Sequence, residues 1–360
     1  MIRIDEIYYN TFLPVVKQHD YHSIHWFDPF GSVDFNNLCS VPSISSALPD
    51  DPNSPNNDVV RYLFWDQEPL HLETANDTLS KFVNIFNTGT RHLVTSEHHS
   101  EFVEQICDMY DFESHYYFFH AWASLDWYRG YDRTFLSKPF RQRQPIKTFL
   151  CPNNIIGGKR KHRLLLLDEL IDRELIYNNL ISFPATCPYE KKTVVELCQI
   201  HDIHLGHVDL PLIIDQGTDY ARNSHRIDLW SQAEQTLLQV VTETVYQGRR
   251  QHLTEKTFKP IVMQQPFILV SCKNSLEYLR RYGFKTFSAF WNEDYDEYDD
   301  QSRIMRIGKL LSDLDNMTAT ERVQLQTHVA DTVEYNKQWF YSREFENILW
   351  KELTTMISQW

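Results

Sequence analysis

The sequence predicts an α/β protein made of two Rossmann-like lobes and a C-terminal helix. Short apolar runs of strand length alternate with amphipathic helical segments, which is typical of parallel sheets. The alternation restarts after a basic segment with prolines, residues 137–146, that we interpret as an interdomain linker. At 360 residues, the chain is long enough for two domains with substantial cores. We therefore predict lobes at 1–140 and 147–335 and a terminal helix at 336–360.

The first predicted lobe begins with mixed apolar and aromatic residues. Residues 41–58 are rich in Pro, Ser, Asn and Asp and predict a loop. The apolar run at 59–65 predicts a buried strand. Ser96, with Glu97 and Ser100, opens a helical pattern that continues to Met109. The other predicted elements are a helix or strand at 79–86, a strand at 92–98 and a strand at 115–120.

The second predicted lobe starts with a strand at 147–152, followed by a basic loop that contains two glycines. Apolar residues at helical spacing after residue 335 predict the terminal helix. The remaining predicted elements are helices at 164–173, 273–282 and 301–330 and strands at 180–183, 207–212 and 239–242.

Bulk properties exclude several classes of protein. The formal charge of −14 argues against a broad nucleic-acid-binding surface. No apolar stretch is long enough to span a bilayer, and the first residues lack a signal-peptide pattern. The six cysteines are scattered without a C-x-x-C pair, which predicts buried thiols in a reducing, cytoplasmic compartment. The motifs G-x-G-x-x-G and G-x-x-x-x-G-K-[ST] do not occur, which disfavours dinucleotide and P-loop enzymes.

Residues 239–271 are the most informative stretch. They predict a strand, a polar loop, a helix capped by Thr254 and a second strand. Glu243 ends the first strand, where an unpaired carboxylate would be costly. Lys256 lies in the first helical turn, where its charge opposes the helix dipole, so it indicates an anionic partner. Together with Glu255, these residues predict a site for a nucleotide diphosphate, specifically a nucleotide-sugar.

Two elements of this stretch resemble the donor-binding segment of the α-1,3-fucosyltransferases. These are T-E-T at 242–244 and H-L-T-E-K-T-F-K-P-I at 252–261. Glu243 matches the first glutamate of the family, and 254–256 match its second element. Thr242 and Thr244 replace the family's Phe and Asn beside Glu243, so the transferred sugar stays open.

The wider chain, including W-D-Q-E-P-L at 65–70 and F-F-H-A-W-A-S-L-D-W at 118–127, resembles glycosyltransferase-like proteins of large tailed phages. The resemblance implies the GT-B architecture, in which two lobes face a cleft. The donor then binds the C-terminal lobe, the acceptor binds the N-terminal lobe, and the last helix packs back on the first lobe.

The resemblance also implies a cation for the diphosphate in the basic loop 153–163. A basic residue after the first strand of the C-terminal lobe has this role in the family, and Arg163 matches it best, with Lys161 as a neighbour. Tyr246 is a candidate for stacking on the nucleobase. We expect no cofactor besides the donor substrate.

An inverting transfer needs a general base near the acceptor hydroxyl. Asp66 and Glu68 directly follow the predicted strand 59–65, and Pro69 favours an extended, rigid backbone after them. His120 ends the predicted strand 115–120. These three residues are the catalytic candidates. The acceptor is a glycan or, given the resemblance to phage proteins, a hydroxymethylated base in DNA; the oligomeric state stays open.

Two alternatives remain at this point. Asp294 and Asp296 form an Asp-x-Asp motif, the metal and diphosphate signature of the other glycosyltransferase fold, GT-A. The leading hypothesis assigns no metal. The second alternative is a non-catalytic module that binds carbohydrate or nucleotide. Binding of sugar rings alone would account for the 14% aromatic residues.

Overall fold

The computed structural model of the protein describes residues 3–18, 22–27, 59–133, 135–214 and 225–360. The predicted loop 41–58 lies outside them. The chain divides into two compact units, each with its own sheet. Unit 1 comprises Met1–Asp126, Gly248–His252 and Glu346–Trp360, and unit 2 comprises Trp127–Gln247 and Leu253–Phe345.

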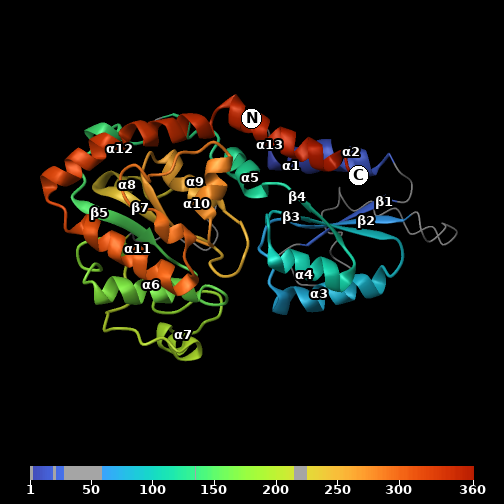
Figure 1. Ribbon diagram of the computed structural model, residues 1–360, viewed down its shortest axis with the longest axis horizontal. Helices are drawn as coiled ribbons and strands as arrows, with labels where there is room; N and C mark the ends of the chain where they lie inside the picture. Colours follow the sequence, from blue (N-terminus) through green and yellow to red (C-terminus); the bar gives the residue numbers. More distant parts are fainter. Residues whose placement is uncertain (1–2, 19–21, 28–58, 134, 215–224) are drawn as a thin grey trace. The chain divides into compact units, whose positions relative to one another are not determined.

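Unit 1 contains a four-stranded parallel sheet in the order β1-β2-β3-β4 (Figure 1). Because each strand is added on the same side of the last, right-handed crossovers bring α3 and α4 to one face. The strands are β1 (His22–Trp26), β2 (Val60–Trp65), β3 (Thr90–Thr95) and β4 (Glu113–Tyr116), and the crossover helices are α3 (Leu72–Ile85) and α4 (Glu101–Tyr110).

Side chains of β2 point alternately to the two faces of this sheet. Leu63 and Trp65 pack in a core with Leu79, Phe82 and Ile106 from α3 and α4. Tyr62 and Phe64 point to the other face. There Phe64 contacts Phe12, and Tyr62 contacts Trp360, with ring centroids 4.8 and 4.2 Å apart.

That second face is covered by the two ends of the chain. The N-terminal elements are α1 (Ile4–Ile7), the π-helix η1 (Tyr8–Phe12) and α2 (Leu13–Val16). The C-terminal helix α13 (Arg343–Ile357) contributes Trp350, which packs on Trp122 of α5 (Phe119–Trp127), and Glu352, which accepts a hydrogen bond from the Phe118 backbone N–H. The last residues of the chain therefore belong to the core of unit 1.

Unit 2 contains a second parallel sheet in the order β6-β5-β7-β8. Helices cover both faces, with α6 and α11 on one side and α9 and α12 on the other (Figure 1). The strands are β5 (Lys147–Pro152), β6 (Leu180–Ser182), β7 (Thr236–Thr242) and β8 (Phe267–Val270). The helices are η3 (Phe140–Gln142), α6 (Lys161–Asp172), α7 (Val194–His201), α8 (Trp230–Gln235), α9 (Glu255–Val262), α10 (Ser275–Arg281), η5 (Asp294–Glu297), α11 (Asp300–Asp315) and α12 (Ala319–Phe340).

The interpretation of 137–146 as a linker was wrong, because this segment is packed into unit 2. Phe140 and Arg143 are buried, and Arg143 donates to the carbonyls of Met263 and Gln264. The preceding residues join unit 2 through Tyr131, whose ring lies 5.6 Å from that of Trp230. Unit 2 therefore begins at Trp127 along the chain.

Several predicted elements differ from the observed ones. The terminal helix predicted at 336–360 is shorter, since α12 continues to Phe340 and α13 begins at Arg343. The helical pattern predicted from Ser96 begins only at Glu101, with Ser100 as the cap of α4. The segment 115–120 is not one strand: β4 ends at Tyr116, and α5 begins at Phe119. The segment 207–212 is no named strand, since Pro211 has no N–H and the segment pairs through an isolated bridge of Leu212 with Phe183. The helix predicted at 301–330 is two helices, because Thr318 caps α12 through a reciprocal pair with Glu321.

The α/β class with parallel sheets, predicted from the alternation, is confirmed. So are β7, α9 and β8 within residues 239–271. Among the described residues, none of the helices is both long and apolar enough to cross a bilayer.

Candidate functional site

The sheet of unit 2 reverses its strand order between β5 and β7. The chain goes from β5 to β6 on one side and then adds β7 and β8 on the other. In parallel α/β sheets, ligands bind at the carboxyl ends of the two strands that flank such a reversal. The loop after β5 leads into α6, and the loop after β7 leads into α9. The predicted donor residues lie in these loops and in the first turns of the two helices.

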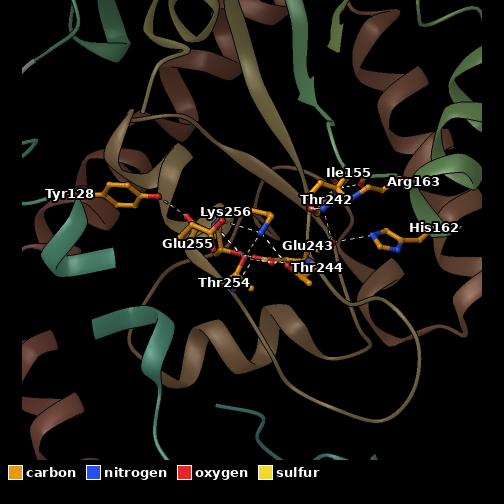
Figure 2. A network of polar contacts seen from close by, with 11 residues as sticks. Tyr128, Ile155, His162, Arg163, Thr242, Glu243, Thr244, Thr254, Glu255 and Lys256 are labelled. Atoms are coloured by element: carbon orange, nitrogen blue, oxygen red, sulfur yellow. Dashed lines mark hydrogen bonds and ion pairs between the residues drawn. The ribbon is translucent and has the colours of Figure 1, made fainter. Parts of the chain in front are cut away.

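Glu243, directly after β7, holds the start of α9 in place (Figure 2). Its side chain is fully buried, and its carboxylate accepts hydrogen bonds from three threonines. Thr254 donates through its backbone N–H at 3.1 Å and its hydroxyl at 2.6 Å, Thr257 donates its hydroxyl at 2.6 Å, and Thr244 donates its backbone N–H at 3.2 Å. These four contacts, which we call the Glu243 clamp, use both carboxylate oxygens and fix the first turn of α9.

Lys256 is held beside the clamp. Its Nζ lies 3.1 Å from Thr244 Oγ1, 3.2 Å from Thr254 Oγ1 and 3.0 Å from Glu255 Oε1. The Lys256 side chain is 32% exposed, whereas the Glu255 side chain is 8% exposed. Tyr128 donates to the Glu255 carbonyl at 3.4 Å. The Lys256 side chain is thus partly exposed at the N-terminus of α9, and three protein contacts hold its ammonium group.

The first turn of α6 is tied to the end of β7. His162 Nε2 lies 3.1 Å from the Glu243 carbonyl oxygen, and Arg163 donates to the carbonyls of Ile155, Thr242 and Glu243 (Figure 2). The Arg163 side chain is buried, and burial lowers its pKa to about 9, with the nearby Arg160 acting in the same direction. The N-terminus of α6 therefore lies at the carboxyl end of β7.

The geometry does not favour the predicted contact of Arg163 with phosphate, because the guanidinium group donates its hydrogen bonds to these three carbonyls. The exposed cations stand just before it: Lys159 is exposed, and Arg160 and Lys161 are half-buried. Burial raises the pKa of Asp300, the first residue of α11, and the charge of Lys161 acts to lower it. A dianionic ligand at this helix start would meet these side chains first.

Tyr246 offers no ring face for a nucleobase, contrary to the prediction. It is 2% exposed, its ring stacks on His162 at 5.1 Å, and the Arg303 guanidinium lies 4.7 Å from its centroid. Its hydroxyl donates to the Asp300 carbonyl. Tyr246 is therefore a core residue that supports the loop after β7.

The Asp-x-Asp motif is engaged in protein contacts. Asp294 pairs with Arg306 at 3.0 Å. Asp296 is buried and accepts from the Leu276 backbone N–H at 3.0 Å, in the first turn of α10, and burial raises its pKa to about 7. These contacts give the two carboxylates structural roles and do not place them together as metal ligands.

In unit 1, Asp66 follows β2 and is fully buried. Tyr8 donates its hydroxyl to Asp66 Oδ2 at 2.7 Å, and Tyr117 donates to the same oxygen. Burial raises the pKa of Asp66 to about 6, although the tyrosine hydrogen bonds act to lower it. Asp66 joins the N-terminal segment to the carboxyl ends of β2 and β4.

His120 and Glu68 lie at the same edge of that sheet. His120 lies in the first turn of α5, is 5% exposed, and packs edge-on against His252 at 4.9 Å. Glu68 is half-buried, so it is the most exposed of the three predicted bases.

Residues 248–252 lie between β7 and α9 along the chain but belong to unit 1. Arg250 forms a buried ion pair with Glu97 at 3.4 Å, and Gln251 exchanges two backbone hydrogen bonds with His98, at 2.8 and 2.9 Å. Gly248 has φ +84°, and a Cβ there would lie 2.5 Å from the Phe102 ring. The segment 248–252, between β7 and α9 along the chain, is thus anchored in unit 1.

The pH dependence of stability should report on Asp66. Its folded pKa of about 6 lies above its ordinary value of 3.8, so its stabilising contribution is complete below pH 3.8 and is lost as pH rises to 6. We expect the unfolding free energy of Asp66→Asn, relative to the wild type, to grow by about 2 kcal/mol from pH 4 to pH 7. Urea unfolding across this range measures it. The control is Asp77→Asn, whose side chain is 74% exposed, and a flat difference for Asp66→Asn would contradict the prediction.

Comparisons with known proteins give little further information about the function of this site. No family model and no curated protein matches the chain. A solved structure that is similar is that of a mutant of S. aureus TarM in complex with fondaparinux, α-GlcNAc-glycerol and UDP. The sequences are 10% identical, with a TM-score of 0.38, over 84% of this chain and 56% of that chain. This chain thus matches little more than half of TarM, and a likeness at this level carries no argument about function.

The structure adds three residues to the site that the sequence analysis did not single out. Asn153, after β5, accepts from the Thr242 hydroxyl at 2.7 Å, His162 contacts the Glu243 carbonyl, and Thr257 completes the clamp. The position of Asn153 directly after a strand was a usable signal. His162 and Thr257 lie within helices and carry no such signal in the sequence.

Proposed function

We propose that the protein is a nucleotide-sugar-dependent glycosyltransferase whose donor binds at the carboxyl edge of the sheet in unit 2. One observation carries the proposal: the Glu243 clamp presents the half-exposed Lys256 at the N-terminus of α9, beside the strand-order reversal. A cation at a helix N-terminus suits a diphosphate. The resemblance of residues 242–261 to the fucosyltransferase donor segment narrows the anion to a nucleotide-sugar.

In this proposal the residues of the site have different roles in binding and transfer. Lys256 and the basic residues at the start of α6 stabilise the negative charge that develops on the leaving diphosphate. Glu255 accepts hydroxyls of the ribose or sugar, while Glu243 positions α9 and does not itself contact the donor. The acceptor is a hydroxyl of a glycan or of a hydroxymethylated nucleobase, and one of the three catalytic candidates removes its proton as the general base. The transfer is inverting and needs no metal.

A thermal-shift screen against UDP-, GDP- and CMP-sugars tests the proposal directly. A ligand that binds only the folded state stabilises it by about 2.7 kcal/mol at a hundredfold excess over its Kd. We expect one nucleotide class to raise the melting temperature, with or without EDTA. Release of nucleotide from that donor separates a transferase from a binding module. If none of the nucleotide-sugars changes the melting temperature, the proposal is wrong.

Replacement of the α9 charges should weaken donor binding. Loss of one charge-assisted contact costs roughly 1.5–3 kcal/mol, so Lys256→Ala should raise the donor Kd by at least about tenfold. Glu255→Ala should also weaken binding, through its hydroxyl contacts. Calorimetry measures both. Lys309→Ala is the control, since its side chain lies on α11 of the same unit and is 68% exposed. Equal affinities in all three variants would place the donor elsewhere.

A further inference from the structure

We propose that His92, Glu113 and His115 form a zinc site in unit 1 and that these residues are distinct from the proposed donor residues and catalytic candidates. The nearest side-chain atoms of the three residues already cluster: His92 Nδ1 lies 2.8 Å from His115 Nε2 and 3.5 Å from Glu113 Oε2. Candidate ligand atoms of all three lie within 4.8 Å of one another.

The sheet register produces this cluster. His92 on β3 is the register partner of Glu113 on β4, and His115 lies two residues further along β4. Because strand side chains alternate between faces, residues 113 and 115 share one face, and 92 stands beside them. The cluster lies toward the amino ends of β3 and β4. Asp66, by contrast, follows the carboxyl end of β2.

The separations are close to those of a zinc site. Two imidazole nitrogens bound to tetrahedral zinc at about 2.0–2.1 Å stand about 3.3 Å apart. The two histidine nitrogens therefore need to separate by about half an ångström. Glu113 Oε2 already lies at about the required distance from His92 Nδ1. Two imidazoles and one carboxylate are a ligand set that zinc accepts, and a water completes the tetrahedron.

Both rings are held by aromatic neighbours. Tyr62 stacks on His92, with centroids 4.8 Å apart and an interplanar angle of 14°, and Trp360 meets the His115 ring edge-on at 5.9 Å. Both histidines are less than 9% exposed, whereas the Glu113 side chain is 70% exposed. Two fixed ligands and one open side give zinc a route of entry.

Titration of the full chain with Co²⁺, followed by displacement with Zn²⁺, tests the site. We expect one equivalent of Co²⁺ with a visible absorption band, displaced by one equivalent of Zn²⁺. His92→Phe keeps a ring against Tyr62 but removes both nitrogens. Since loss of a supporting contact alone costs 10–100-fold in metal affinity, loss of this ligand should cost at least about 100-fold.

The controls separate this site from other histidines and from misfolding. His99→Ala should bind Co²⁺ like the wild type, although His98 and His99 have ring centroids only 3.8 Å apart. Glu113→Gln changes a side chain that is mostly exposed and should weaken binding about tenfold, even if His92→Phe fails to fold. The proposal is overturned if the wild type binds no stoichiometric Co²⁺. It is equally overturned if Glu113→Gln, or a folded His92→Phe, binds as tightly as the wild type.

Discussion

Glu68→Gln is expected to lower the rate of sugar transfer by about 10²–10⁴-fold, the contribution of a general base. The acceptor hydroxyl arrives from solvent, so its base must be accessible. Glu68 is half-buried, whereas Asp66 and His120 are 0% and 5% exposed. The donor Kd should not change, because a general base acts on the acceptor hydroxyl and Glu68 is not among the proposed donor residues. Turnover and donor calorimetry on the same preparations measure both quantities.

Matched variants make this prediction decisive. Glu73→Gln, an exposed glutamate in the first turn of α3, should transfer sugar like the wild type. Asp66→Asn and His120→Ala should keep turnover well above that of Glu68→Gln, since we expect them to act on the folded structure. If one of them loses turnover while Glu68→Gln keeps it, the base is the buried residue. If all three keep it, the base lies outside this set.

Glu243→Ala should lower the free energy of unfolding by about 3–5 kcal/mol and abolish donor binding. The change leaves four buried donors on Thr244, Thr254 and Thr257 without their acceptor. Each unsatisfied buried donor costs about 1–3 kcal/mol, and water that enters the cavity recovers part of the sum. Without the clamp, Lys256 also loses its fixed neighbours Thr244 and Thr254. Urea unfolding and donor calorimetry measure the two effects.

Glu243→Gln provides an intermediate. It keeps the shape and one acceptor oxygen, but its NH₂ group faces donors, so its loss of stability should be smaller than that of alanine. Glu277→Ala in the same unit is the control, because its pair with Arg281 is about half exposed and worth about 0–1 kcal/mol. A loss for Glu243→Ala no larger than the control's would show that the clamp does not hold α9. Unchanged donor affinity of Glu243→Ala would show that the clamp plays no part in donor binding.

The sequence by itself determined several local elements of both units. Short apolar runs of strand length predicted β2, β5 and β7, and the cap at Thr254 predicted the start of α9. These features depend on neighbouring residues, which interact with the same backbone whatever the rest of the chain does. The alternation of strands and helices then sufficed for parallel sheets. It also placed Glu243 and Lys256 at the ends of adjacent elements.

Only the tertiary structure decided what each polar group contacts. From the sequence, Arg163 and Tyr246 were plausible ligand-binding residues. In the structure, Arg163 donates to the carbonyls of Thr242 and Glu243, and the ring of Tyr246 stacks on His162. A buried polar group takes whichever partner the fold places within reach, and that partner is distant in sequence. His92 and His115 are likewise 23 residues apart and meet because the register of β3 and β4 aligns them. Spacing along the chain carries no information about such register, so these contacts required the folded chain.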